Sequence, residues 1–490
     1  MIRRRFVSTT RFATPFVLAV ALSGAAGCSL APSPEPPTLA APDSWRSATG
    51  AAGGPTVADN WWQAFDDPRL DELVAAGLTA NHDLALAISR IEEARALARL
   101  AGADRLPAVA LEAGAARTRL SRQGGALAPG ADAVFDSGRV AATASFELDL
   151  FGRARNQAEA ARQDLLAATS TRDAVRLAVV SDIVTTWFDL AGLDRQVTVT
   201  RESIETRRRT EQLVRDRFEG GLVSRLDLER ARAERAGAEA ALPEIERRRR
   251  ATENRLAILL GGMPGAIERG RGLEELVVPE VPADLPSELL LRRPDVAVAE
   301  ARLAAASARV GQARAALFPS IGLTGYYGRE SAELSSLFHP AALVWQAAAG
   351  LLQPVFQGGR NRALVAASEA RQKQAVIAYL ATAEGAFRDV EDALFATQTR
   401  RERRTALAEQ SAALTAAAGI ARDRYEEGES DFLEVLDVER SRLVAELELV
   451  AARRDELAVA VDLYRALGGG FGGLGAAPAS GTGSSTGGAL

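Results

Sequence analysis

The sequence is poor in the residues on which most metal sites and many enzymes depend. Its 490 residues include one cysteine, Cys28, and two histidines, His82 and His339. One cysteine excludes an intrachain disulfide and a cysteine-based metal site, and two histidines so far apart argue against histidine-dependent catalysis or metal binding. Because the sequence also shows no nucleophile–base pair, phosphate loop or Gly-rich cofactor turn, we predict neither an enzyme nor a bound cofactor.

Excess charge and aromatic side chains are also scarce. The net charge is -5 at pH 7, which offers no basic field to a nucleic-acid partner. Aromatic residues make up only 5% of the chain, whereas alanine is abundant. Alanine is the best helix former and lets helix backbones approach closely, so the composition predicts long helices in close contact.

The amino terminus has the pattern of a targeting segment. A basic stretch precedes an apolar run over 16–22 and a small-residue run over 23–27, directly before Cys28. The apolar run is too short to span a bilayer. The segment resembles a bacterial lipoprotein signal peptide, which implies removal of residues 1–27 and acylation of Cys28, for example by palmitate. Because Ala25 stands where such signals usually have leucine, cleavage near an incidental cysteine is the alternative.

Two segments of biased composition flank the body of the chain. Residues 28–57 are rich in Pro and Ala and predict an extended tether. Residues 468–490 are rich in Gly, Ser and Thr and predict a disordered tail. We therefore expect the folded body to lie between these two segments.

The body of the chain contains two copies of one unit. Landmarks in the first copy recur in the same order in the second, at a nearly constant offset. The pairs are Asn81–Ala87 with Arg293–Ala299, Leu106–Leu111 with Phe318–Leu323, Phe151–Asn156 with Phe356–Asn361, and Arg215–Gly221 with Arg422–Gly428. We predict an internal duplication, with a first repeat over 58–275 and a second over 276–467.

Each repeat contains one very long helical segment. Residues 153–218 and 360–425 are charged, rich in alanine and almost free of Gly and Pro, with apolar residues at helical spacing. A single helix of this length extends about 100 Å at about 1.5 Å per residue. Such helices are typical of coiled-coil-like assemblies and not of globular domains.

Short strand signals precede each long helix. Apolar and polar residues alternate over about 107–121 and 137–151 in the first repeat, and over about 318–329 and 342–356 in the second. Alternation of this length is typical of transmembrane barrel strands. Four strands cannot close a barrel, so strands that enter a membrane must come from several chains. A soluble β-layer that caps the helices is the alternative.

Four stretches resemble the outer-membrane efflux factor family (TolC-like), and within it the lipoprotein branch typified by OprM and NodT. They are Trp61–Leu70, Leu290–Asp295, Gly311–Ser320 and Tyr425–Asp437, and the similarity spans about 60–470. The resemblance implies a mainly α fold with a small transmembrane β part. Long helical hairpins and four strands per chain would assemble as a homotrimer, with a 12-stranded barrel over an α-helical tunnel.

The resemblance also implies a function. The protein would be the outer-membrane exit channel of a tripartite efflux pump, conducting substrates passively and gated at its periplasmic helix ends. Its partners would be a periplasmic adaptor (membrane fusion) protein, an inner-membrane transporter of the resistance-nodulation-division type, and outer-membrane lipid. Ser29 after the cysteine favours delivery to the outer membrane, with most of the mass in the periplasm. The alternative is a periplasmic adaptor or structural lipoprotein without a pore.

The resemblance places the gate just after the second long helix. On α-helical spacing Leu433, Glu434, Asp437 and Arg440 form one stripe. The family carries an inward-facing carboxylate at the position of Asp437 and, in some members, at that of Glu434. Three copies would form an acidic ring that favours cations, and Asp227 matches the corresponding site in the first repeat. Bonding between helices through Asp437 and Arg440 in the closed state is a hypothesis; ordinary surface pairing along one helix, such as Asp437 with Arg440, is its alternative.

The helix ends themselves are expected to receive the adaptor protein. The residues implied as contacts are Arg215, Arg217, Gly220, Gly221, Arg422, Arg424 and Gly428. The alternative for the glycines is a purely structural role, because glycine supplies the left-handed residue that ends a helix. For the arginines it is a solvated, charged helix end.

Overall fold

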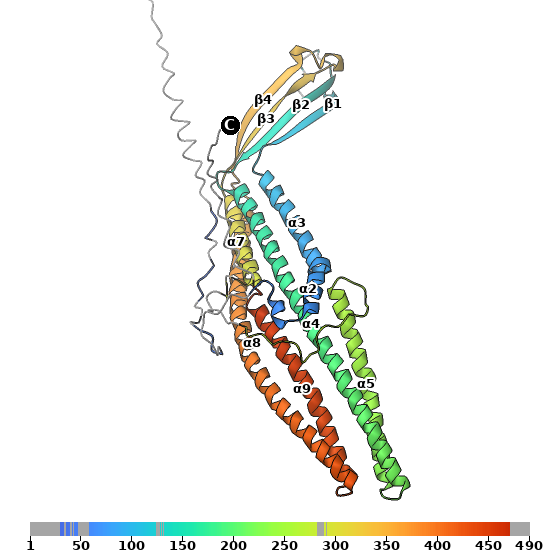
Figure 1. Cartoon of the computed structure of the whole chain (residues 1–490). Helices are drawn as coiled ribbons and strands as arrows, with labels where there is room; N and C mark the ends of the chain where they lie inside the picture. The colour runs from blue at the N-terminus through green and yellow to red at the C-terminus, as the bar shows by residue number, and fades with distance from the viewer. Residues whose placement is uncertain are drawn as a thin grey trace, which may run out of the picture. The chain divides into compact units, whose positions relative to one another are not determined.

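The computed structural model is mainly helical, with one sheet (Figure 1). It describes residues 30–33, 36–39, 42, 44–47, 58–123, 128, 130, 132–281, 289–290 and 292–470. The predicted signal peptide, Cys28 and most of the predicted tail lie outside these residues. The shorter helices are η1 (Trp61–Phe65), α2 (Pro68–Ala80), α3 (His82–Ala103), α5 (Arg225–Leu259), α7 (Pro294–Ala315) and α9 (Phe432–Ala466).

Two helices dominate the chain. Helix α4 runs from Arg153 to Glu219 and has 67 residues, and α8 runs from Arg360 to Glu427 and has 68 residues. Both match the expected segments to within two residues. Neither contains Pro, and the isolated glycines Gly192 of α4 and Gly385 and Gly419 of α8 do not end a helix. Within the described residues, no helix combines the length and the apolar character needed to cross a membrane.

The four strands form one antiparallel sheet in the order β1-β2-β3-β4. They are β1 (Ala108–Arg119), β2 (Val134–Leu148), β3 (Ser320–Ser331) and β4 (Leu343–Leu352). The two hairpins are joined through β2 and β3, with Phe146 opposite Leu323. The sheet therefore unites the two repeats, and the mainly α fold with four strands per chain is confirmed.

Two strands, β2 and β4, end at least three residues earlier than the sequence predicts. Strand β2 stops at Leu148 because the Asp149 carboxylate accepts hydrogen bonds from the backbone N–H groups of Ala154 and Arg155, at 3.1 and 2.7 Å. These bonds begin α4 and turn the chain out of the sheet. Strand β4 stops at Leu352, two residues before Pro354, which has no N–H to donate to a ladder.

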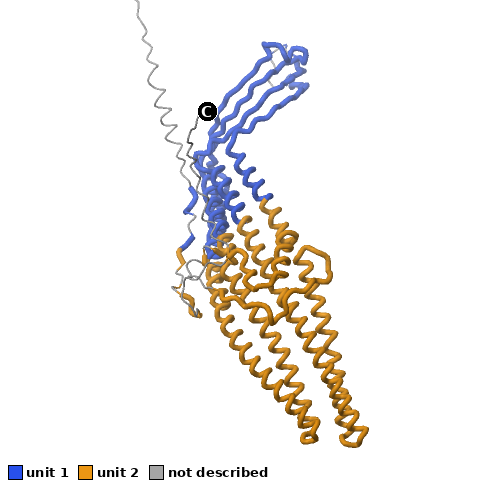
Figure 2. Tube along the Cα trace, viewed as in Figure 1, with its two compact units in different colours: residues 1–37, 92–167, 300–379 blue, residues 38–91, 168–299, 380–490 orange. Residues whose placement is uncertain are grey.

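The chain divides into two compact units (Figure 2). Unit 1 comprises residues 1–37, 92–167 and 300–379, and unit 2 comprises 38–91, 168–299 and 380–490. Each unit takes segments from both sequence repeats, so the units do not follow the predicted repeat boundaries. The reason is that strands of the two repeats pair within one sheet, where β2 of the first repeat lies beside β3 of the second.

The scarce aromatic residues gather in the core of unit 2. The Trp61 ring stacks on Tyr464 with centroids 5.0 Å apart, and Phe65 meets Phe188 edge to face at 4.9 Å. The indole N–H of Trp187 donates to the buried carboxylate of Asp67 at 2.9 Å. These contacts attach the segment before α2 to α4 and α9.

Candidate functional site

The first helix turn, between α4 and α5, is built by local capping. Gly221 has φ +74°, the left-handed conformation that reverses the chain. The hydroxyl of Ser224 accepts a hydrogen bond from the N–H of Asp227, and the Asp227 carboxylate accepts one from the N–H of Ser224, both at 3.2 Å. Asp227 therefore completes a capping box at the start of α5.

The second turn, between α8 and α9, follows the same plan. Gly428 has φ +83°, and the N–H of Glu429 donates to the carbonyl of Arg424 at 2.8 Å. The Asp431 carboxylate caps α9 by accepting from the N–H of Glu434 at 3.1 Å. Gly221 and Gly428 thus have the structural role that the sequence left as an alternative.

An apolar cluster packs the two turns together. It consists of Val214, Leu228, Ala231, Ala421, Tyr425, Phe432, Val435 and Leu436, all buried. The Tyr425 and Phe432 rings are tilted with centroids 5.5 Å apart. Since these residues come from α4, α5, α8 and α9, the ends of both helical hairpins form one core.

Arg217 adds a polar link between the hairpins. Its guanidinium donates to the carbonyls of Tyr425 and Glu426 at 2.7 and 2.6 Å, and it lies over the Tyr425 ring at 4.5 Å. Carbonyls at a helix end have no partner within the helix. Arg217 of α4 therefore caps the end of α8. Burial raises the pKa of the Tyr425 hydroxyl above its usual value, although Arg217 opposes this shift.

A second link joins Arg440 of α9 to Glu234 of α5. The Arg440 Nε donates to Glu234 at 2.7 Å, and Arg207 of α4 donates to the same carboxylate and, at 3.2 Å, to the Glu234 carbonyl. Burial alone would raise the pKa of Glu234, but the two guanidinium groups outweigh it and hold this pKa below the usual glutamate value. Sequence reasoning missed Glu234, because nothing in its local pattern marks it.

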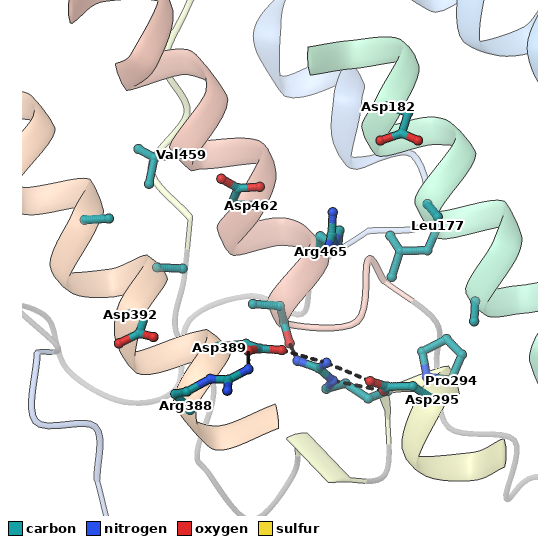
Figure 3. A pocket seen from close by; sticks show the side chains of 16 residues that line it. Leu177, Asp182, Pro294, Asp295, Arg388, Asp389, Asp392, Val459, Asp462 and Arg465 are labelled. Carbon is teal, nitrogen blue, oxygen red and sulfur yellow. Dashed lines mark hydrogen bonds and ion pairs between the residues drawn. The ribbon is translucent and has the colours of Figure 1, made fainter. Parts of the chain in front are cut away.

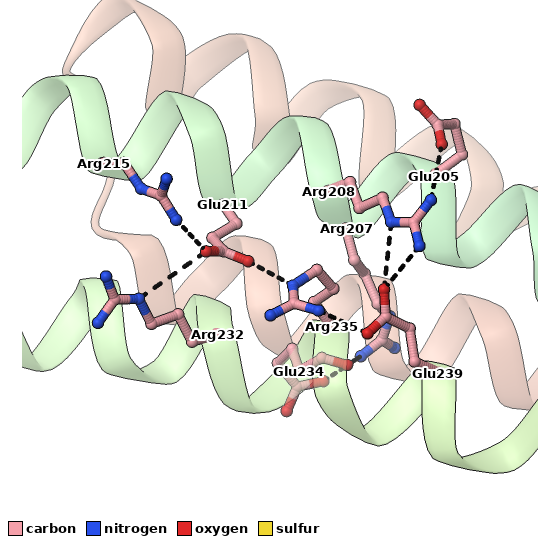
Figure 4. A network of polar contacts seen from close by, with 9 residues as sticks. All are labelled: Glu205, Arg207, Arg208, Glu211, Arg215, Arg232, Glu234, Arg235 and Glu239. Atoms are coloured by element: carbon pink, nitrogen blue, oxygen red, sulfur yellow. Dashed lines mark hydrogen bonds and ion pairs between the residues drawn. The ribbon is translucent and has the colours of Figure 1, made fainter.

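Glu234 belongs to a larger network between α4 and α5 (Figure 4). The nearly buried carboxylate of Glu211 accepts hydrogen bonds from Arg215 and Arg235, both at 2.6 Å. Arg208 donates to Glu239 at 2.8 Å. Charges shared in this way stabilise one register of the two helices against sliding.

The predicted gate stripe is an exposed face of α9. Leu433, Asp437 and Arg440 are exposed, while the carboxylate of the half-buried Glu434 accepts a hydrogen bond from Arg424 at 2.8 Å. Arg440 forms an ion pair with Glu234 and not with Asp437. The ion-pair partner of Arg440 is therefore not the residue that helical spacing places beside it on α9. No ion pair involves Asp437 within the part of the chain that the structure describes.

The arginines predicted as adaptor contacts all have partners within the chain. Arg215 binds Glu211, Arg217 caps α8, Arg422 binds Glu439 and Arg424 binds Glu434. Gly220 donates its N–H to the carbonyl of Asp216 at 3.0 Å. These residues stand at the turns, where Arg217, Arg422 and Arg424 each bind a second helix, whereas Arg215 pairs within α4.

Unit 2 also contains a charged cleft of about 970 Å3 (Figure 3). It is lined by five aspartates, namely Asp182, Asp295, Asp389, Asp392 and Asp462, and by Arg293, Arg388 and Arg465. Arg293 bridges Asp295 and Asp389 at 2.7 and 3.1 Å and donates to the Ala466 carbonyl at the end of α9. Across the described ranges, no three His, Cys, Asp or Glu residues are grouped as metal ligands.

Comparison with known proteins gives one consistent result. The sequence matches the family described as Outer membrane efflux protein over residues 73–262 and again over 285–469. This double match confirms the predicted duplication. OprJ of Pseudomonas aeruginosa is 36% identical over 448 residues, which cover 91% of this chain and 93% of OprJ.

Two further relatives support the same assignment. The cation efflux system protein CusC of Escherichia coli K12 is 33% identical, over 93% of this chain and 98% of CusC. The open-state crystal structure of the Neisseria gonorrhoeae MtrE outer membrane channel superimposes with a TM-score of 0.82 and 33% identity. That superposition covers 91% of this chain and 99% of MtrE.

Proposed function

This chain belongs to the outer membrane efflux protein family, and we propose that it is the exit channel of a tripartite efflux pump, closed at its periplasmic helix ends. Its relatives are outer-membrane efflux channels, so export across the outer membrane is its function. The single observation that carries the channel assignment is the four-stranded sheet, whose outer strands β1 and β4 each pair on one side only.

The sheet explains why several copies are needed. A strand edge in hydrocarbon leaves backbone N–H and C=O groups without partners, and closed barrels need about eight strands or more. Three copies provide twelve strands, with β4 of one copy next to β1 of the following copy. The barrel is then continuous, and each chain contributes a third of the wall.

The helix ends supply the gate. The Arg440–Glu234 pair, the Arg217 cap and the apolar cluster all hold the α4/α5 and α8/α9 hairpins together. The same arrangement leaves Asp437 and Leu433 exposed on α9. Around a threefold axis these residues would line the narrowest part of the passage, where a ring of carboxylates favours cations over anions.

The first experiment measures single-channel conductance in planar bilayers. Replacing both Asp437 and Arg440 by Ala removes the carboxylate ring and breaks the link between α9 and Glu234, which Arg207 still binds. We therefore expect conductance to rise several-fold with weaker cation preference. Glu234→Gln alone should raise conductance without changing the preference. Arg247→Ala is the matched control, because among the described residues Arg247 pairs with Glu244 alone, along the exposed face of α5. Unchanged currents in both gate variants would contradict the proposed gate.

The partners follow from the same assignment. An adaptor protein would meet the helix turns at Gly220, Gly221 and Gly428, and an inner-membrane transporter of the resistance-nodulation-division type would drive export. We further propose that Cys28 is acylated and anchors the chain to the outer membrane. A pore-free adaptor or scaffold would fractionate as a monomer, whereas the channel should migrate as a trimer until it is heated.

A further inference from the structure

The two faces of the four-stranded sheet differ in polarity. Successive side chains of a strand point to opposite faces, so the ladder register assigns each strand residue to one face. Glu112, Arg139 and Glu330 share one face, on which Glu112 accepts a hydrogen bond from the Thr143 hydroxyl at 3.3 Å. A barrel strand turns its polar side to the lumen and its apolar side to lipid. The face of these charged residues is therefore the luminal face.

The opposite face, here named the lipid face, is apolar over most of its length. Leu111, Tyr327 and Trp345 lie in one row of its ladder and are 78%, 64% and 70% exposed. From the row of Leu351 to the row of Trp345, the described strands place no charged residue on this face. Leu351 and Leu343 lie eight residues apart on β4, which is about 27 Å along the strand. At the tilt of barrel strands, about 40°, this length spans about 20 Å of bilayer.

Charged residues appear on the lipid face at the end of the sheet that is closed by loops, opposite the end where the helices join (Figure 1). They are Arg329, Asp136, Arg117 and Arg119. The Arg329 guanidinium donates to the carbonyls of Phe338 and His339 at 2.8 and 2.7 Å, so it orders the loop after β3. The end of β1 thus presents two arginines, with the carboxylate of Asp136 beside them.

Neither of these two arginines is held strongly by the chain itself. The Arg117 Nε lies 3.6 Å from the Asp136 carboxylate, and the two side chains are 75% and 57% exposed, which makes this a weak pair. Arg119 is exposed and lies opposite Val134 in the ladder. Among the residues that the structure describes, its guanidinium has no hydrogen-bond or ion-pair partner. Two guanidinium groups are therefore available to an external anion.

The position of the two arginines along β1 points to the lipid headgroups. Arg117 is four residues beyond Ala113, which shares its row with Arg329 and Leu343. Four residues of a tilted strand rise about 10 Å. The headgroups add about 5–8 Å on each side of the hydrocarbon core, and long arginine side chains can reach toward them. Guanidinium groups bind phosphate through paired hydrogen bonds.

We propose that Arg117 and Arg119 form a binding site for the phosphate groups of the glycolipid in the outer leaflet, with one site per chain. The site rests on the proposed function, because it requires the sheet to stand in the outer membrane. Since β1 is an edge strand, each site lies at the boundary between two copies of the trimer. The bound phosphate fixes the height of the barrel in the membrane, and the acyl chains cover Val109 and Leu111 of the same strand.

Lipid binding to the purified trimer in detergent tests the site. The probe is lipid A with two phosphates, compared with lipid A from which both have been removed, and native mass spectrometry counts the molecules retained. We expect the phosphorylated lipid to half-saturate the trimer at an about tenfold lower concentration than the dephosphorylated lipid. Arg117→Gln combined with Arg119→Gln should abolish this difference, because the charge-assisted hydrogen bonds to phosphate are lost.

Arg209→Gln combined with Arg225→Gln is the matched control. It also removes two arginines, which lie on α4 and α5 of unit 2 and are 79% and 81% exposed. Both are loosely paired with a carboxylate, at 3.9 and 3.7 Å, as Arg117 is. The control should bind the phosphorylated lipid as the natural protein does.

Three results would overturn the glycolipid site. They are equal binding of the two lipids by the natural trimer, an equal loss of binding in the two double variants, and displacement of the lipid by inorganic phosphate. The last result would assign the arginines to a free anion. The unheated trimer band and the planar-bilayer current are measured on the same preparation. If both are absent, the proposed channel fails; if both are present and the two lipids bind equally, only the glycolipid site fails.

Discussion

At the scale of single residues, buried polar contacts fix the positions of neighbouring helices. The Asp67 carboxylate is 2% exposed and caps α2 through the N–H of Arg69. Its other oxygen accepts the indole N–H of Trp187. A buried carboxylate is costly unless its hydrogen bonds are made, so each of these donors has a role in stability.

The substitution Trp187→Phe tests how much the hydrogen bond from the indole N–H to Asp67 contributes to stability. The aromatic ring remains but the N–H is lost, and we expect the free energy of unfolding to fall by about 1–3 kcal/mol. Trp345→Phe is the control, since the Trp345 side chain is 70% exposed. Denaturant unfolding followed by circular dichroism gives both values. Equal effects in the two variants would show that the Asp67 bond contributes nothing.

At the scale of elements, the two helical hairpins depend on their turns. Gly221 and Gly428 both have left-handed backbones, and an added Cβ at either position would meet no atom within 4 Å. A side chain at either position would therefore destabilise the turn only through the left-handed backbone conformation, and not through a steric clash. In the middle of a helix, replacing glycine by alanine instead stabilises the fold, because alanine is the better helix former.

This difference makes a paired prediction. Gly221→Ala and Gly428→Ala should each destabilise their turn by about 1 kcal/mol. Gly385→Ala, inside α8 with open space at its Cβ, should be neutral or stabilising by up to about 1 kcal/mol. Hydrogen exchange at the turns and proteolysis between residues 218 and 224 provide the measurement. Protection of the turns equal to that in the natural protein would contradict the capping role.

At the scale of the whole molecule, apolar surface lies on the helices next to the edge strands. Helix α3 precedes β1 and exposes Leu97 to 53%, and α8 follows β4 and exposes Ile377 to 66%. Both side chains are solvated in one isolated chain. If β4 of one copy adjoins β1 of the next, these helices adjoin as well and the two surfaces become buried.

A charged residue on these surfaces should weaken trimer assembly and leave the fold of the single chain unchanged. We expect Leu97→Glu and Ile377→Glu to weaken the trimer, because burial of an unpaired carboxylate costs at least about 2 kcal/mol. Leu222→Glu is the control, since Leu222 is 77% exposed at a helix turn. Electrophoresis without heating reports the trimer band. A fully retained trimer in both variants would place the subunit contact elsewhere.

The sequence by itself determined the elements and their order. The helices at 153–219 and 360–427 follow from long stretches with almost no Gly or Pro, and the strands follow from alternation of apolar and polar residues. The repeat, the family and the positions of the two helix turns were also readable. These properties are local, so the residues within one element are enough to specify them.

Only the tertiary structure decided the partners. Arg440 binds Glu234, which lies 206 residues earlier in the chain, and not its neighbour Asp437. Likewise Arg217 of α4 caps α8, a helix of the other repeat. Such pairings depend on the register and depth at which packed elements meet. That geometry is set by the packing of many side chains at once, and it cannot be predicted from the residue spacing within one element.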